Sequence, residues 1–286
     1  MELLRKPISL IVKVLIARTE GTSLNAACRI FGIAKNTLLL WENRMSPVKD
    51  ALLIYSLSQS FISQVIEGDE LYTKVYENKP VEDCEGWTVM LMERANRFIW
   101  AMSCGEKDEK LFLNAMEKLV SIIRQTKDIT LLTDGERRYG NILFDICHEI
   151  IKTSLPGRPK KTLPEGVKVR LKNKGSRSHV PGRKRKKYEA PQKEHPDTIQ
   201  DINQEEIHAN HLEGQNAATR RKLSAYRRKT NTYAKSKPGL QRVLNLYWVV
   251  HNFIRIHFTT KVVPAVGMNI LASNPTWENI LMLDTC

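Results

Sequence analysis

Three acidic residues that lie far apart in the sequence have the chemistry and the local settings that a divalent-metal site requires. Asp69 lies in the β-prone stretch "GDELYTKV", Asp134 follows the apolar run "LLT", and Glu213 lies in a long polar stretch of helical character. Carboxylate oxygens are the ligands that hard cations such as Mg²⁺ and Mn²⁺ prefer. Two such ions, about 4 Å apart, can activate an attacking oxygen and stabilise a leaving oxygen in phosphodiester displacement.

Asp134 and Asp69 also have plainer interpretations. Asp134 precedes Gly135, a pairing that is typical of a simple turn, and Asp69 has a second acid, Glu70, beside it. Two observations favour the metal site. Strand alternation places Asp134 at the end of a largely buried strand, and acids that gather in a polyanion-binding protein repel phosphate unless a metal ion intervenes.

The stretches between these acids predict an α/β sheet. Three β-prone runs, "DELYTKVYE", "GWTVMLMERA" and "RFIWAMSCG", are followed by an amphipathic helix, "DEKLFLNAMEKLVSIIRQTK", then by a strand, "DITLLTDG", and a second helix. Three strands that can pair antiparallel, a helix, a parallel-type strand and a helix favour a mixed sheet with flanking helices. On the later polar helix, Ala209, Glu213, Asn216 and Arg220 share one face, which can approach a sheet edge.

Residues 1–50 predict an all-α unit of the helix-turn-helix type. In "SLNAACRIFGIAKNTLLLWENRM", Ser23 caps one helix, Gly32 suits the turn, and a second helix ends near Arg44. That helix would present a set of residues to the major groove of DNA: Lys35, Asn36, Thr37, Trp41 and Arg44. The alternative is an ordinary helical hairpin without DNA contact. We expect residues 51–66 to form a helical linker.

The charge of the chain predicts a polyanionic partner. The 286 residues carry a formal net charge of +14, and the isoelectric point is near 9.6. Much of the excess lies in a Pro- and Gly-containing insertion, residues 155–200, within which "VKVRLKN" can still form one strand. The expected DNA contacts in this insertion and on the later helix are Arg158, Lys160, Lys161, Arg183, Lys184, Arg185, Asn216, Arg220, Arg221, Arg227 and Arg228. Within the insertion, "LPGRPKK" resembles a small minor-groove hook. The alternative, which we favour, is a solvated basic loop that binds phosphates without reading sequence.

Several other classes of function are disfavoured by the sequence. The chain has no apolar run of about 18 residues, so no membrane span is expected. His208 and His211 have a spacing that can hold zinc, but no paired cysteines lie near them. We find no glycine-rich nucleotide loop and no motif for a nucleophilic serine or cysteine.

The quoted stretches around the three acids carry a family resemblance. "GDELYTKV", "LLTDGERRYG" and above all "HANHLEGQNAATRRKLSAYRRKTNTYAKSKPGLQRVLNLYWVVHNFIRIHF" resemble transposases of the insertion-sequence-one family, in particular its cyanobacterial branch. The resemblance extends from about Asp69 to Met268. One departure is that the His-Asn pair of the family reads Gln215-Asn216 here.

The resemblance implies a ribonuclease-H-like catalytic domain, residues 67–270, that contains the basic insertion and is followed by a tail, residues 271–286. It implies an Asp-Asp-Glu triad, Asp69, Asp134 and Glu213, with Mg²⁺ or Mn²⁺ as the cofactor. It also implies a bacterial cytoplasmic, nucleoid-associated enzyme that acts on double-stranded DNA as a homodimer or larger assembly. Two alternatives stay open: a catalytically silent repressor that binds DNA, and a nuclease for RNA–DNA hybrids.

Overall fold

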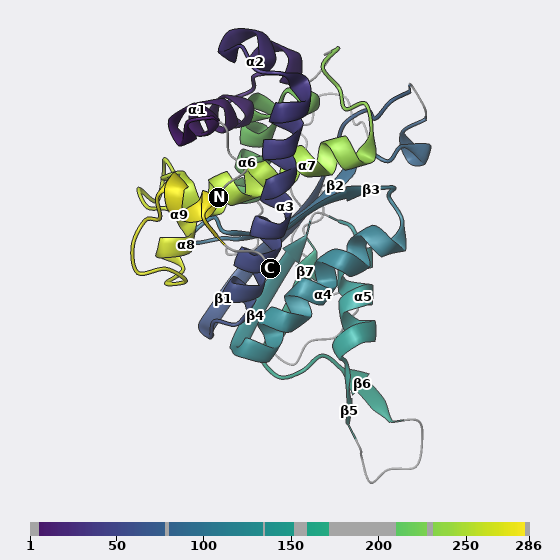
Figure 1. The fold of residues 1–286 in the computed structure, drawn as a ribbon. Coiled ribbons are helices and arrows are strands. Elements are labelled where there is room, and N and C mark those ends of the chain that lie inside the picture. Colours follow the sequence, from purple (N-terminus) through teal and green to yellow (C-terminus); the bar gives the residue numbers. More distant parts are fainter. Residues whose placement is uncertain are drawn as a thin grey trace, which may run out of the picture.

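A mixed five-stranded sheet with helices around it forms the centre of the computed structural model (Figure 1). The structure describes residues 6–77, 80–133, 135–151, 159–171, 210–227 and 231–283. The strands of the sheet are β1 (Phe61–Tyr72), β2 (Trp87–Glu93), β3 (Ile99–Gly105), β4 (Thr126–Thr133) and β7 (Val167–Leu171). The main helices are α1 (Ile8–Thr19), α2 (Leu24–Phe31), α3 (Lys35–Leu57), α4 (Glu109–Gln125), α5 (Arg138–Cys147), α6 (Asn210–Lys222) and α7 (Lys237–Val249).

The strand order is β3-β2-β1-β4-β7. Strands β1, β2 and β3 are antiparallel neighbours, whereas β4 lies parallel to both β1 and β7. The predicted mixed sheet with flanking helices is therefore confirmed, and its arrangement is compatible with a ribonuclease-H-like fold. Of "VKVRLKN", the strand expected inside the basic insertion, the first five residues form the edge strand β7, and the last two lie outside the described residues.

Strand β1 differs from the sequence prediction. Residues 61–66 were expected to belong to a helical linker, but they form the first half of β1. The polar residues that obscure this strand in the sequence are buried and partnered: Gln64 Oε1 accepts a hydrogen bond from Trp100 Nε1 at 3.0 Å. As a consequence, Asp69 lies near the carboxyl end of a long strand and does not open a short one.

Helix α3 also differs from its expected extent. The second helix of the predicted helix-turn-helix continues to Leu57 instead of ending near Arg44, and Pro47 lies within it. The buried residues Met45, Val48 and Leu52 continue one apolar stripe along this helix, and α3 packs against α7, which crosses it (Figure 1). The stripe explains the extra length, because a helix is stabilised mainly by the packing of its apolar face.

A buried charge cluster joins the N-terminal helices to α7. The Glu42 carboxylate of α3 is fully buried and accepts hydrogen bonds from Arg18 Nε of α1 at 2.5 Å and from Arg242 Nε of α7 at 3.0 Å. Arg18 also donates to the carbonyl of Thr22 at 2.5 Å, which fixes the turn between α1 and α2. The cluster therefore ties three helices together at one point.

The side chains of α7 and the turn that follows it cover the free edge of the sheet at β3. The backbone N–H of Cys104 donates to Gln241 Oε1 at 2.9 Å, and the carbonyl of Ile99 accepts from Trp248 Nε1 at 2.6 Å. Asn252, in a π-helical turn (Val250–Ile254) that follows α7, exchanges two hydrogen bonds of 2.9 Å with the backbone of Ile99. These contacts satisfy edge groups that would otherwise be available for pairing with another chain.

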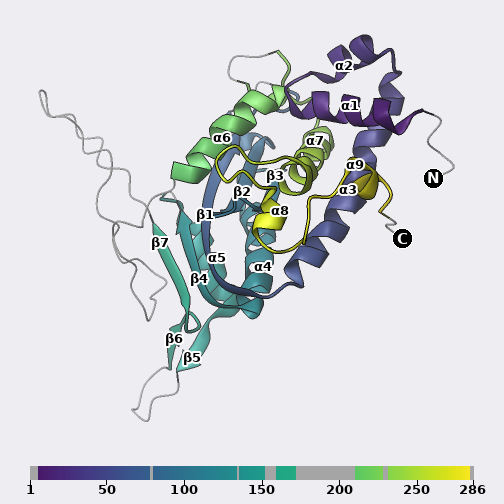
Figure 2. The same ribbon diagram turned by 90° about the vertical axis from the view of Figure 1, so that its left-hand side faces the viewer.

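The remaining described segments are peripheral. Strands β5 (Glu149–Ile151) and β6 (Lys160–Thr162) form a hairpin that projects from the end of the molecule opposite α6 (Figure 2). Two short helices, α8 (Pro264–Gly267) and α9 (Trp277–Leu281), close the C-terminal part. None of the helices within the described ranges is both long enough and apolar enough to cross a lipid bilayer.

Candidate functional site

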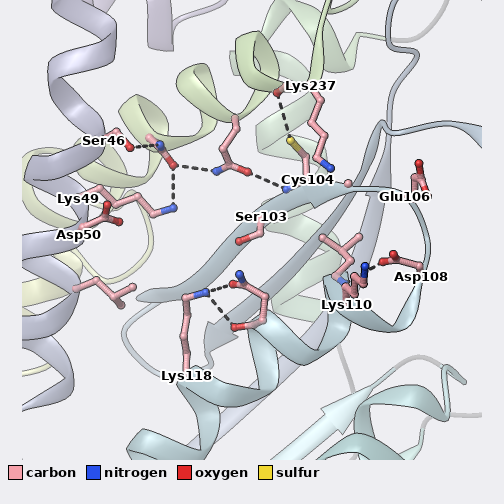
Figure 3. Close-up of a pocket in the computed structure, with 16 residues that line it drawn as sticks. Ser46, Lys49, Asp50, Ser103, Cys104, Glu106, Asp108, Lys110, Lys118 and Lys237 are labelled. Carbon is pink, nitrogen blue, oxygen red and sulfur yellow. Dashed lines mark hydrogen bonds between the residues drawn. The ribbon is translucent and has the colours of Figure 1, made fainter.

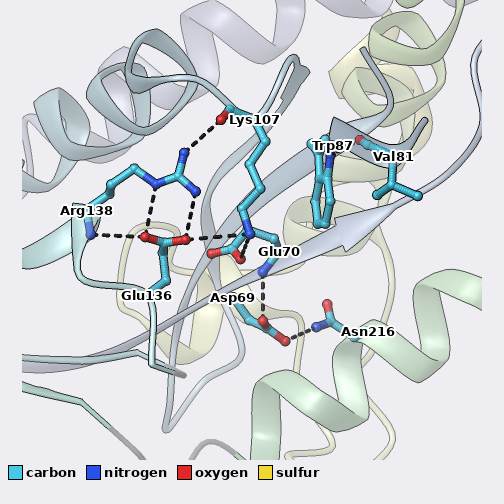
Figure 4. Close-up of polar contacts among 8 residues, drawn as sticks. All are labelled: Asp69, Glu70, Val81, Trp87, Lys107, Glu136, Arg138 and Asn216. Atoms are coloured by element: carbon cyan, nitrogen blue, oxygen red, sulfur yellow. Dashed lines mark hydrogen bonds and ion pairs between the residues drawn. The ribbon is translucent and has the colours of Figure 1, made fainter. Parts of the chain in front are cut away.

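Asp69 is held at the centre of the sheet by a side chain from α6. Its Oδ2 accepts a hydrogen bond from Asn216 Nδ2 at 2.7 Å, and its Oδ1 accepts one from the backbone N–H of Glu70 at 2.8 Å (Figure 4). Asp69 remains partly exposed, whereas Asn216 is buried. The structure therefore presents one carboxylate to solvent in a fixed orientation on the central strand β1.

Glu67, two residues earlier on β1, explains why α6 lies where it does. Its buried carboxylate accepts hydrogen bonds from the backbone N–H of Leu212 at 2.8 Å and from Arg94 Nε at 2.8 Å. The first of these bonds satisfies a donor in the opening turn of α6, where no intrahelical partner exists. Because Asn216 lies one turn further along the helix, this anchor brings its amide to Asp69.

Glu70 faces a different group of side chains. Lys107 Nζ lies 3.1 Å from the Glu70 carboxylate and 3.5 Å from that of Glu136, so it joins the two acids (Figure 4). Arg138 donates two hydrogen bonds to Glu136, at 3.0 and 2.8 Å. Burial acts to raise the pKa of Glu136, but the hydrogen bonds and charge of Arg138, with the charge of Lys107, bring that pKa below its usual value. The structure thus distinguishes Asp69 from Glu70, which the sequence could not do.

The end of strand β4 lies directly beside this site. Thr133, the last residue of β4, pairs with Gly68 of β1, the residue before Asp69. A Cβ atom on Gly68 would lie 3.2 Å from the Thr133 methyl group and 3.5 Å from the Tyr139 ring, so this position suits a residue without a side chain. Asp134, which follows Thr133 in the sequence, lies outside the described residues.

Glu213 lies on an exposed part of α6, in the turn before Asn216. Among the residues that the structure describes, no three His, Cys, Asp or Glu side chains form a group that could hold a metal ion. That result covers Asp69 and Glu213 but not Asp134. The predicted triad therefore stays a prediction.

The oxygen atoms around Asp69 suit a hard cation. Asn216 Oδ1 is buried and has no hydrogen-bond partner within the described ranges, although the amide nitrogen of the same side chain is bonded to Asp69. An unsatisfied buried oxygen of this kind calls for a water molecule or an ion. Reversing the amide would turn this oxygen toward the Asp69 carboxylate, so the assigned orientation is the favourable one. The donor set present, one carboxylate and one free amide oxygen, fits Mg²⁺ or Mn²⁺.

The predicted DNA-binding residues of the N-terminal helices differ in how exposed their side chains are. Lys35 and Asn36 are exposed at the start of α3, and Thr37 is half-buried. Trp41 is only 5% exposed and belongs to the hydrophobic core, so its expected contact with DNA is wrong: its large apolar ring packs inside the N-terminal helices. Arg44 is half-buried and donates to the carbonyl of Leu281 at 3.0 Å, so its guanidinium is already engaged at the end of α9.

The later basic residues also separate into groups. Lys160 and Lys161 are exposed on the projecting hairpin, and Arg221 and Arg227 are exposed near α6. Arg220 is half-buried. Asn216, expected to contact DNA, is buried against Asp69 and so positions a carboxylate instead. Arg158, Arg183, Lys184, Arg185 and Arg228 lie outside the described residues.

A cleft of about 650 Å³ lies between α3, α4 and α7 (Figure 3). Its lining includes both lysines and acids, among them Lys49, Lys118, Lys237, Asp50 and Asp108. Lys49 Nζ donates to Asn245 Oδ1 at 2.8 Å. Burial, and then the charge of Lys118, lower the pKa of Lys49 to about 8.

This shift predicts a pH-dependent contribution of Lys49 to stability. Between pH 8 and 10.5 the unfolded chain binds more protons at this lysine than the folded chain, so the contribution of Lys49 to the free energy of unfolding should rise with pH across that interval. Below pH 8 the full penalty, at most roughly 3 kcal/mol, applies. Lys49→Met should remove it, and Asn245 Oδ1 keeps a bond from Gln241 Nε2. Urea unfolding of both proteins at pH 7.5, 9 and 10.5 would measure the difference, and parallel curves would contradict the prediction.

Comparison with known proteins finds similarity to solved structures. No protein-family model and no curated protein matches the chain. Among solved structures, the chain is similar to the Drosophila P element transposase strand transfer complex, with 12% sequence identity and a TM-score of 0.33. The similarity covers 58% of this chain and 41% of the transposase chain, so it spans less than half of that protein. A likeness of this size does not establish a shared activity.

Proposed function

We propose that this protein is a DNA transposase with a ribonuclease-H-like catalytic domain, which binds the terminal inverted repeats of an insertion sequence. The observation that carries the proposal is the position of Asp69. It is a partly exposed carboxylate on the central strand β1, fixed by Asn216 of α6, one residue beyond the pairing of Gly68 with Thr133 at the end of β4. Antiparallel β1 to β3 followed by parallel β4 and β7 agrees with that fold.

In this proposal Asp69, Asp134 and Glu213 hold the divalent ions, Mg²⁺ or Mn²⁺. When bound, the ions supply the positive charge that phosphodiester displacement requires at the attacking and leaving oxygens. Asn216 fixes the Asp69 carboxylate, and Glu67 fixes the helix that carries Asn216 and Glu213. Orienting the acids before the substrate arrives avoids reorganisation during the reaction.

The substrate in this proposal is double-stranded DNA. Water cuts the element at its end, and the freed 3′ hydroxyl then attacks target DNA. The exposed Lys35 and Asn36 of α3 contact the terminal repeat, and exposed cations such as Lys160 and Arg221 bind phosphates. Joining two ends requires at least two copies of the chain, so we propose a homodimer or a larger assembly, active in the bacterial cytoplasm at the nucleoid.

A strand-transfer assay tests this function. The purified protein is incubated with Mg²⁺ or Mn²⁺ and a duplex that carries the end of the element with its flanking DNA. We expect cleavage and joining, both lost in Asp134→Asn and in Glu213→Gln. Asp128→Asn is the matched control, because this half-exposed acid lies near the start of β4 and pairs with Lys168 at 2.9 Å.

Three results would overturn parts of the proposal. Unchanged cleavage by Asp134→Asn and Glu213→Gln would show that the assigned triad is wrong. Tight binding of the end duplex without cleavage would indicate a repressor derived from a transposase. Cleavage of RNA–DNA hybrids with no preference for the terminal repeat would indicate a hybrid nuclease.

A further inference from the structure

A groove of about 490 Å³ opens next to the Asp69 site, at the end of the β1–β2 hairpin. It is bounded on one side by this hairpin and on the other by α6 and the 3-10 turn that follows it, Ser224–Tyr226. The two sides are tied together: Thr73 donates to the carbonyl of Ala225, and Thr88 shares a hydrogen bond with the Tyr226 hydroxyl. These two hydrogen bonds fix the two sides of the groove relative to each other.

Aromatic rings form one part of the lining. Tyr72 and Trp87 lie with their ring centroids 5.2 Å apart, and Tyr233 lines the groove as well. All three side chains are partly exposed. The Trp87 ring is held in place, since its Nε1 donates to the carbonyl of Val81 at 2.9 Å and Lys107 Nζ lies 4.4 Å from the ring centroid (Figure 4). Fixed, partly exposed rings of this kind are platforms on which nucleobases stack.

Cationic side chains form the other part. Arg220, Arg227 and Lys74 line the groove, and within the described residues Arg220 makes no hydrogen bond or ion pair. The one acid in the lining, Glu70, is paired with Lys107 at 3.1 Å, which offsets its repulsion of phosphate. The planar guanidinium of Arg220 can therefore bind a phosphate with two parallel hydrogen bonds.

The lining of the groove includes residues close in the chain to the candidate catalytic residues. Glu70, which lines the groove, follows Asp69 on β1, and Arg220 lies one turn beyond Asn216 on the same face of α6. Its volume is typical of sites for small molecules, about 300–1,000 Å³. A double helix does not enter a space of this size, whereas a single nucleotide fits.

We propose that this groove binds one unpaired nucleotide of the DNA strand beside the phosphate that is cut. The base stacks on Trp87 and Tyr72, and the phosphate binds Arg220. This inference rests on the proposed function for the identity of the strand, but the groove itself selects an unpaired nucleotide over a base pair. Strand separation near the cleavage point would therefore be assisted by the protein.

Binding without metal tests the groove separately from catalysis. The probe is a fluorescein-labelled oligomer of eight thymidylates, measured by fluorescence anisotropy in EDTA. We expect Arg220→Gln and Trp87→Leu each to weaken binding about tenfold, in line with the usual contributions of charged hydrogen bonds and base stacking. Arg124→Gln, at an exposed arginine in the last turn of α4 and outside the groove, is the charge-matched control and should lose less than about threefold. Trp87→Phe, which keeps a ring, should restore most of the affinity.

Photochemical crosslinking locates the bound base. In the same oligomer one thymine is replaced by 5-iodouracil, which crosslinks to nearby aromatic side chains, and mass spectrometry identifies the modified peptide. Crosslinks at Tyr72, Trp87 or Tyr233 are expected. Crosslinks confined to other segments, or equal losses of affinity for Arg220→Gln and Arg124→Gln, would overturn the proposal. A protein that passes these tests but cuts no DNA would contradict the transposase function and leave the groove assignment standing.

Discussion

Asp69→Asn is expected to reduce DNA cleavage by about 100- to 1,000-fold while leaving the fold intact. The amide has nearly the same shape as the carboxylate and can still accept a hydrogen bond from Asn216. In the unaltered protein, Asn216 Nδ2 lies 2.7 Å from Asp69 Oδ2. It lacks the negative charge that binds a hard cation, and loss of one preorganised electrostatic group at a reaction centre typically costs 10²- to 10³-fold. Single-turnover cleavage on a denaturing gel would measure the loss, with thermal unfolding as the check on the fold.

The role of Asn216 predicts a smaller and different effect. Asn216→Ala leaves the carboxylate in place but removes the donor that orients it, and changes of this kind typically cost 10- to 100-fold in metal affinity or activity. The Mg²⁺ concentration needed for half-maximal cleavage should therefore rise in Asn216→Ala. Asp69→Asn, in contrast, should not be rescued by added Mg²⁺. Equal rates for Asp69→Asn and the unaltered protein would refute the assignment of Asp69 as a ligand.

Glu42→Ala is expected to destabilise the protein by about 3–5 kcal/mol, because it leaves two charged partners without their carboxylate. Arg18 is buried, and both it and Arg242 lie within 3.0 Å of Glu42. At this chain length the melting temperature should fall by roughly 10 °C. Urea unfolding followed by circular dichroism would give the free energy.

A surface ion pair provides the matched control for Glu42. Glu20 pairs with Arg255, and the Glu20 side chain is 49% exposed, so Glu20→Gln should cost less than about 1 kcal/mol. The double variant Arg18→Leu with Glu42→Leu should recover part of the loss, because apolar groups then replace a buried ion pair. If Glu42→Ala and Glu20→Gln were equally stable, the cluster would have no role in joining α1, α3 and α7.

The apolar strands and the amphipathic helix were predictable because their side-chain pattern is local. β2 and β3 are buried along most of their length, and α4 buries Leu111, Ala115 and Leu119 on one stripe, as the sequence indicates. The first half of β1 was not predictable from this pattern. Its Gln64 and Glu67 are buried only because Trp100 and Arg94, about thirty residues away, satisfy them, and no local rule supplies those partners.

The candidate site was also only partly predictable from the sequence. Residue type and spacing could single out Asp69 as one of two adjacent acids. The choice between Asp69 and Glu70 depends on Lys107 and Asn216, which lie 37 and 147 residues from their partners in the chain. Trp41 was misassigned because an aromatic ring on a predicted recognition helix looks the same in sequence whether it faces DNA or the core. Asn216 was expected to contact DNA for a similar reason. An amide can serve either role, and the fold decides.

The hydrogen bond between Asn216 and Asp69 also sets the time at which the site can first exist during synthesis. Asn216 follows Asp69 by 147 residues, so the ribosome, at roughly 5–20 residues per second, makes the two partners roughly 7–30 s apart. Within that interval β1 can pair with β2 and β3, but α6, which donates hydrogen bonds to Glu67 and Asp69, has not yet been synthesised. A nascent chain therefore carries the Asp69 carboxylate without the amide that orients it, and a product that terminates before residue 210 cannot orient its central acid.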